Sequence, residues 1–197
     1  PDGDTGNDRM WNFLDRFGIQ KKEERMKLAF VCLLTAVGVP MIFAGDEFAD
    51  RMDFDPAGMW RDDAKQSDPL NLDRLEDPWR RRLFEYVGRL VRLRTGSDAL
   101  AVNDTEFLLF DLQAGRRVVA WKRGRPEQDP VVVVANFSGF GTDVSQPDAE
   151  YRVPGWPATP PGRSWREVTQ DRAVPEEWVG REPIFPWEAQ VYTLDPA

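Results

Sequence analysis

The sequence contains no histidine and a single cysteine, Cys32. Ser-His-Asp and Cys-His catalysis require histidine, and most catalytic zinc sites use it as a ligand. One cysteine cannot form a disulfide within the chain, and its place in an apolar run is typical of a small buried side chain. Any catalysis by this chain would therefore rest on carboxylates, and we expect no cofactor and no bound metal.

The sequence also lacks an excess of positive charge, because 26 Lys and Arg stand against 34 Asp and Glu, for a net charge of -8. Nucleic acids bind cationic surfaces, so we expect no nucleic-acid partner. The uncharged run from Leu28 to Gly45 is interrupted by Gly38 and Pro40, which favours a helix followed by a strand over a membrane span. The chain starts at Pro1 without a signal-peptide pattern, and we expect a part of a longer, cytoplasmic protein.

Helical periodicity and a short apolar run predict α/β structure in residues 1–99. Apolar residues three and four apart predict a helix from about Lys21 to Val37, and Gly38 is a natural stop. Val39 to Ala44 is apolar on both faces, which is typical of a buried strand in a parallel sheet. Asp50 to Glu76 predicts a long functional loop.

A second helix is predicted from Asp77-Pro78 to Gly96, because Asp is a good cap and Pro suits the first turn. Its expected apolar face consists of Leu83, Phe84, Val87, Leu90 and Val91. After a boundary near Leu100, short runs of Val, Phe, Tyr and Trp predict an antiparallel β-sandwich over residues 100–197. The predicted strands are Glu106 to Leu112, Arg117 to Lys122, Val131 to Asn136, Glu150 to Val153, Ser164 to Val168 and Ala189 to Leu194.

The stretch VGVPMIFAGDEFAD, from Val37 to Asp50, breaks abruptly from apolar residues into two carboxylates. A buried parallel strand delivers the residues at its carboxyl end into a crevice, where α/β folds bind ligands. Asp46 and Glu47 would then stand at the rim of that crevice. The alternative is that the two acids cap the next turn or bind an arginine structurally.

Several segments, in order, resemble the α-amylase family (glycoside hydrolase family 13). GVPMIFAGDEF is similar to its eighth barrel strand and the acids that follow. DGDTGNDRMWNFL resembles the stretch after strand seven, KKEERMKLAFVCLLTAVG resembles helix seven, and KQSDPLNLDRLEDPWRRRLFEYVGRLVRLRTGSDAL resembles the following loop and helix eight. VVAWKRG, DPVVVVANFSG and WEAQVYTL are similar to strands of domain C. The resemblance implies the last β/α repeats of a TIM-type barrel over residues 1–99 and domain C over residues 100–197.

The resemblance implies retaining chemistry on α-glucans, with an Asp nucleophile after strand four, a Glu acid/base after strand five and a third Asp after strand seven. The first two belong upstream of this chain, which alone is expected to be inactive. Asp4 matches the third position, as transition-state stabiliser, although Asp2 and Gly3 replace the family's Asn and His. Asn7 and Arg9 are candidates for the same loop.

Tryptophans and loop acids are further candidates. Flat indole faces suit sugar rings, although most tryptophans are core residues. Sugar binding and core packing are both open to Trp11, Trp156 and Trp187. Trp60 is the best binding candidate, because it lies in the loop after the predicted strand. Acids in the same loop would bind calcium or stand as ordinary solvated groups. These acids are Asp53, Asp55, Asp62 and Asp63.

Two strands and two helices cannot close an eight-stranded barrel. We therefore expect an exposed apolar strand edge and self-association of this chain. The expected partner is an α-glucan oligosaccharide or polysaccharide, with Asp46 and Glu47 lining or buttressing the cleft. The alternative is a non-catalytic carbohydrate-binding or interaction module that shares ancestry with the family.

Overall fold

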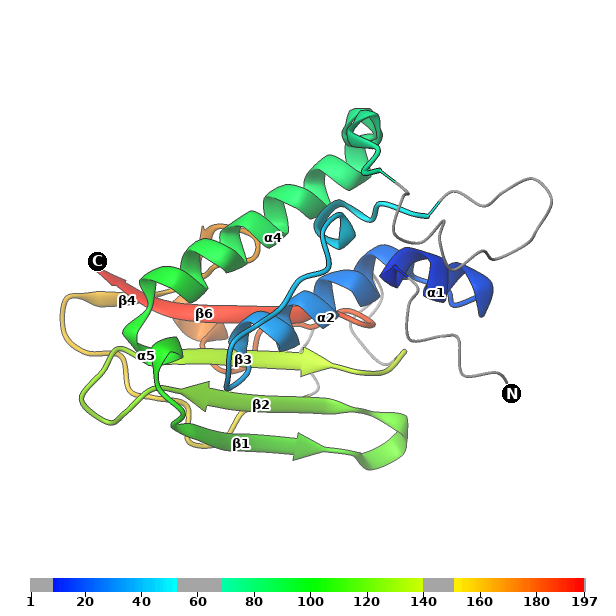
Figure 1. Cartoon of the computed structure of the whole chain (residues 1–197). Helices are drawn as coiled ribbons and strands as arrows, with labels where there is room; N and C mark the ends of the chain where they lie inside the picture. Colours follow the sequence, from blue (N-terminus) through cyan, green and yellow to red (C-terminus); the bar gives the residue numbers. More distant parts are fainter. Residues whose placement is uncertain (1–8, 53–68, 140–150, 197) are drawn as a thin grey trace.

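The computed structural model describes residues 9–52, 69–139 and 151–196, with helices first along the chain and strands after them (Figure 1). The α-helices are α1 (Met10–Arg16), α2 (Lys22–Thr35), α4 (Pro78–Gly96) and α5 (Asp98–Ala101). The strands are β1 (Thr105–Asp111), β2 (Val118–Arg123), β3 (Val131–Asn136), β4 (Arg163–Glu167), β5 (Arg172–Ala173) and β6 (Ala189–Pro196). The all-β character expected after Leu100 is confirmed.

The six strands form one sheet in the order β1-β2-β3-β6-β4-β5, with every neighbouring pair antiparallel. Strand β3 lies between β2 and β6, and all six of its residues are buried. Side chains alternate between the two faces of a strand. Val131, Val133 and Ala135 therefore join one hydrophobic cluster, and Val132 and Val134 join the other.

Helices α2 and α4 lie across one face of the sheet (Figure 1). Met26 and Phe30 of α2 and Leu83 and Leu90 of α4 share a core with Val133 of β3. The opposite face is covered by segments outside the regular strands. Their buried side chains are Tyr151, Val153, Val174 and Ile184.

Helix α2 forms where the periodicity predicts it, because its buried side chains recur three and four residues apart. Two arginines satisfy the carbonyl groups at its end, which would otherwise lack partners. Arg94 of α4 donates to the carbonyl of Ala36 at 2.7 Å, and the buried Arg123 of β2 donates to that of Thr35. Arg123 also donates to the carbonyls of Val102 and Asp104, which ties the sheet to the helices.

Helix α4 begins at Pro78 and ends at Gly96, as the sequence predicts. Leu83, Val87 and Leu90 form its buried face. The expectation for Phe84 and Val91 was wrong, because both are exposed. Tyr86 is buried in their place.

The buried strand predicted over Val39 to Ala44 is not formed: these residues have irregular structure, and Val39 and Met41 are 97% and 86% exposed. A central parallel strand requires hydrogen-bonded neighbours on both sides. No strand of the described residues pairs with this segment, since all six belong to the antiparallel sheet. The barrel part of the predicted fold is thus not seen in the structure.

The predicted sandwich also differs from the structure. The described strands form a single hydrogen-bonded sheet, because β6 pairs with β3 through one end and with β4 through the other. Residues 151–153 form no strand and instead pack over the sheet. The short strand β5 was missed, since a two-residue strand has no periodicity to detect.

Within the described ranges, none of the helices combines the length and the apolar character needed to cross a membrane.

Candidate functional site

A tight turn follows the exposed apolar segment and holds the predicted site acids. It starts at Gly45, whose φ of 99° is in the left-handed region that glycine adopts readily. A Cβ atom here would lie 2.6 Å from Nη1 of Arg9, 2.7 Å from Cδ2 of Leu70 and 2.9 Å from Cβ of Asp50. Glycine is therefore required twice, for its conformation and for the close approach of Arg9.

Asp46 connects this turn to the start of α1. Its Oδ1 accepts a hydrogen bond of 3.1 Å from the backbone N–H of Met10, the first residue of that helix. Burial raises the pKa of Asp46 to about 6, against the opposing effects of the Met10 N–H and the Arg9 guanidinium. Asp46 thus satisfies the N-terminus of a helix that lies earlier in the chain, whereas the sequence analysis considered a cap of the next turn or an arginine pair.

Glu47 closes its own turn. Its Oε2 accepts a hydrogen bond of 2.7 Å from the backbone N–H of Gly45. The side chain is half-buried. In the described contacts, both acids therefore buttress the turn, and their predicted role in binding sugar stays a prediction.

The most buried acid of the turn is Asp50, which the sequence analysis did not select. Its side chain is fully buried, with Oδ1 paired to Arg74 and Oδ2 3.6 Å from Nη2 of Arg9. Arg9 also donates to the carbonyl of Ala44 and lies over the ring of Phe43, 5.0 Å from its centroid. Two cations converging on one carboxylate give a charge-paired anchor for the turn.

Of the predicted site residues, Arg9, Asp46 and Glu47 are therefore brought together around one turn. Asp4, Asn7 and Trp60 lie outside the described residues, as do the loop acids considered for calcium. Asp50 stands four residues after Asp46, but no spacing rule indicates its arginine partners, which come from distant parts of the chain. Among the described residues, no cluster of His, Cys, Asp and Glu could hold a metal ion.

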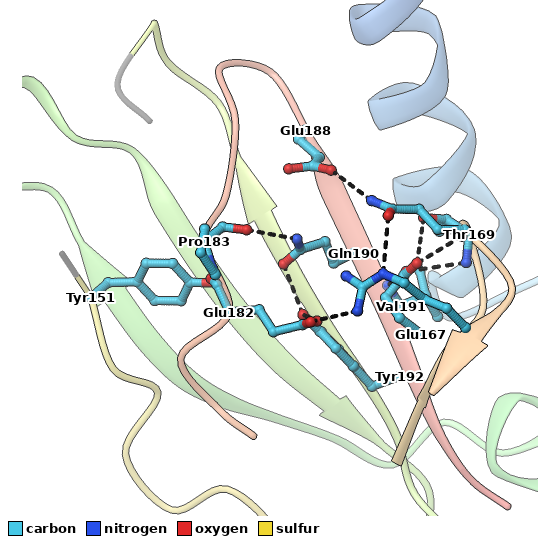
Figure 2. A network of polar contacts seen from close by, with 11 residues as sticks. Tyr151, Glu167, Thr169, Glu182, Pro183, Glu188, Gln190, Val191 and Tyr192 are labelled. Carbon is cyan, nitrogen blue, oxygen red and sulfur yellow. Dashed lines mark hydrogen bonds and ion pairs between the residues drawn. The ribbon is translucent and has the colours of Figure 1, made fainter. Parts of the chain in front are cut away.

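A second polar cluster lies at the β4–β6 side of the sheet and was not predicted (Figure 2). Its centre is Glu167, which is fully buried. Glu167 accepts four hydrogen bonds, from the N–H groups of Val191 (2.9 Å), Thr169 (3.1 Å) and Gln170 (2.7 Å) and from the Thr169 hydroxyl (3.0 Å). Burial raises the pKa of Glu167, and these donors oppose the shift.

Two further carboxylates extend the network. Glu182 pairs with Arg172 at 2.6 Å, and its Oε2 lies 2.7 Å from the Tyr192 hydroxyl. Glu188 accepts from the Phe185 N–H at 2.7 Å and from Gln170 Nε2 at 3.3 Å, and burial raises its pKa to about 7. These bonds join loops to strands or to one another, so the network fixes loop conformation. Among the groups named here, none is arranged as a nucleophile with a base.

The chain was compared with known proteins. No family model matches the sequence, and no curated protein matches it. Solved structures do match. The catalytic module of SpuA, a multi-modular glycogen-degrading pneumococcal virulence factor, has a TM-score of 0.67 at 14% identity over 96% of this chain and 35% of that chain. Pullulanase type I from Bacillus subtilis str. 168, solved with maltose, has a TM-score of 0.61 at 18% identity over 93% of this chain and 25% of that chain.

A maltogenic amylase from S. marinus matches with a TM-score of 0.54 at 17% identity over 88% of this chain. This chain spans 20% of that amylase, so each of the three matches involves a minor part of a longer enzyme. The resemblance to the α-amylase family is thereby confirmed in structure, at the level of a shared fold.

Proposed function

We propose that this chain is the C-terminal portion of a retaining glycoside hydrolase that acts on α-1,4 or α-1,6 glucosidic bonds. The observation that carries the proposal is that nearly the whole chain shares its fold with part of a maltogenic amylase, a pullulanase and a glycogen-degrading enzyme. The order of the sequence motifs supports the same assignment.

The proposed reaction uses three carboxylates. One attacks the anomeric carbon, one donates and then accepts the proton, and a third stabilises the charged transition state. In this proposal the first two are supplied by residues upstream of Pro1, and Asp4 is the third. The chain alone then has no hydrolytic activity.

The turn at Gly45 has a supporting part in this proposal. Arg9 follows the Asp4 loop closely in sequence and is held by Asp50 and by the Ala44 carbonyl. Asp46 fixes the next residue, Met10, through its backbone N–H. These contacts anchor the chain immediately after the predicted catalytic loop, as positioning of an active-site loop requires.

The exposed apolar segment gives a second supporting argument. Val39 and Met41 are almost fully exposed, and Val37 and Phe43 are more than half exposed. Alternate residues of this kind suit a strand that lacks its neighbours. A barrel completed by upstream β/α repeats would provide those neighbours.

The proposal is tested by sequencing the reading frame upstream of Pro1 and assaying the protein it encodes. We expect further β/α repeats, with an Asp after the fourth strand and a Glu after the fifth. The longer protein should release reducing sugar from maltoheptaose or pullulan, and Asp4→Asn should lower kcat by at least about a hundredfold. An upstream frame without these repeats, or full activity in Asp4→Asn, would overturn the proposal.

A further inference from the structure

A cleft of about 640 Å³ lies between the two long helices and the loops that precede β5 and β6. This volume is within the range of about 300–1,000 Å³ that is typical of small-molecule sites. The cleft shares no lining residue with the turn at Gly45. Its walls come from α2 and the residue before it, from α4, from Thr169 and Gln170, and from residues 185–189.

Aromatic surface is presented on one side of the cleft by Phe185 and Trp187. Phe185 is 53% exposed, although its backbone N–H is bound by Glu188. Trp187 has a φ of 62°, a left-handed conformation that is unusual for a bulky side chain. Such conformations persist where surrounding contacts enforce them, often at binding sites.

Contacts on both sides of Trp187 enforce its position. Its backbone N–H donates to the carbonyl of Ser138 at 3.1 Å. The guanidinium of Arg25 stacks on its ring, 3.4 Å from the centroid. Arg25 is not among the residues that line the cleft, so it holds the indole from outside.

The polar network described above makes the same wall rigid (Figure 2). Thr169 and Gln170 line the cleft, and both are hydrogen-bonded to the buried Glu167. Glu188, a further lining residue, binds the Phe185 N–H and the Gln170 side chain. A wall fixed in this way loses little conformational entropy when a ligand binds.

The charges around the cleft nearly cancel, which decides the class of ligand. The lining residues of each sign are interspersed: Lys21, Lys27, Arg82 and Arg89 against Glu24, Glu85 and Glu188. A cation-rich site would select an anion and an acidic site a cation. Mixed donors and acceptors next to aromatic faces instead suit a neutral molecule with many hydroxyl groups.

We propose that this cleft is a binding site for a neutral oligosaccharide of the α-glucan class, separate from the site of hydrolysis. The identity of the sugar rests on the proposed function, whereas the preference for a neutral polyhydroxylated ligand rests on the cleft itself. In a polysaccharide-degrading enzyme, such a site would hold a second stretch of the substrate chain.

The test is a titration of the full 197-residue chain with maltoheptaose by isothermal calorimetry, with cellohexaose and a sulfated oligosaccharide as comparison ligands. We expect maltoheptaose to bind and Phe185→Ala to weaken it about tenfold, because the exposed ring provides apolar contact. Phe110→Ala, which removes a similarly exposed ring from β1, is the matched control and should leave the affinity unchanged.

Folding of each variant is checked by its thermal midpoint. If Phe185→Ala unfolds, Phe185→Leu replaces it, since leucine keeps apolar bulk at this exposed position and removes the flat ring. A titration with no heat for maltoheptaose, equal affinity in the cleft variants, or binding of the sulfated ligand alone would overturn the inference. Binding in the cleft without an upstream barrel would leave this inference standing while the hydrolase proposal failed.

Discussion

At the scale of single residues, three buried carboxylates hold this structure together in different ways. Asp50 is paired with two arginines, Asp46 accepts from a helix N-terminus, and Glu167 accepts four hydrogen bonds from neighbouring loops and β6. Each is buried, so the loss of its partners would leave charge without compensation. Substituting each carboxylate should therefore have a different effect on stability, because one pairs with arginines and the others accept hydrogen bonds from N–H and O–H groups.

Asp50→Ala should be strongly destabilising. The change leaves the guanidinium groups of Arg9 and Arg74 without the carboxylate between them, and breaking a buried pair costs about 3–5 kcal/mol. The measurement is the free energy of unfolding in urea. Glu24→Gln, which breaks an exposed pair with Lys21, is the control and should cost less than about 1 kcal/mol. Equal effects for the two variants would show that Asp50 is not an anchor.

Asp46 makes stability depend on pH in a defined direction. Its pKa is raised from 3.8 to about 6, so the folded state binds the proton more tightly than the unfolded state. The stabilising contribution of the protonated form is complete below about pH 3.8 and is lost as pH rises through about 6. It amounts to about 3 kcal/mol, at 1.36 kcal/mol for each unit of pKa shift.

Asp46→Asn isolates this effect, because an amide oxygen still accepts from the Met10 N–H but does not titrate. We expect the unfolding free energy of the wild type to fall relative to the variant between about pH 4 and pH 6, and to run parallel to it above about pH 7. The comparison requires urea unfolding at a series of pH values. Parallel curves throughout would mean that Asp46 titrates normally.

At the scale of elements, the sequence predicts what depends on local patterns. Helix α2 and helix α4 are found within about two residues of their predicted ends, and β3 has the predicted bounds. Periodicity and capping residues act within one segment, so the sequence of that segment is enough to predict its helix or strand. The strand predicted over Val39 to Ala44 fails because pairing requires partners elsewhere, which an apolar run does not reveal.

The candidate site shows the same division. The sharp change at Gly45 correctly marked a turn rich in acids, because glycine and clustered carboxylates are local signals. The importance of Asp50 depends on Arg9 and Arg74, which are distant in sequence. The wall of the cleft depends on bonds between β4, β6 and their loops, which no short motif encodes.

Arg123 is a polar link between the sheet and the segments around the helices, in addition to the shared hydrophobic core. Arg123→Ala leaves the carbonyl groups of Thr35 and Val102 without their arginine donor, whereas the Asp104 carbonyl still accepts from the Gly124 N–H. Unsatisfied buried groups cost about 1–3 kcal/mol each. We expect a loss of roughly 3 kcal/mol or more in urea unfolding. Lys122→Ala, the adjacent residue with a surface pair to Glu106, should change stability by less than about 1 kcal/mol.

At the scale of the whole molecule, apolar surface is exposed along residues 37–43, beyond the end of α2. We expect the chain to self-associate through this segment, because exposed alternate apolar residues pair readily with another strand. Val39→Lys with Met41→Lys should shift the weight-average mass toward the monomer in sedimentation equilibrium. Both side chains are almost fully exposed, so stability should change little.

The sheet edge at β1 provides the control for this prediction, since Phe107 and Phe110 are also exposed there. Phe110→Lys should leave association unchanged. If Phe110→Lys gives the monomer and the double variant does not, β1 is the interface and the expectation for residues 37–43 fails.

The hydrophobic cluster that α2 and α4 share with β2, β3 and β6 has a consequence for how such proteins evolve. Genes recombine most successfully where the two exchanged parts have few contacts. A crossover near Leu100 would bring a foreign sheet against Phe30 and Leu90, which share one buried cluster with Val131 and Val133. The helices and the sheet should therefore be inherited together. Substitutions in the helical half of this hydrophobic cluster should be matched by substitutions in the half that the strands contribute.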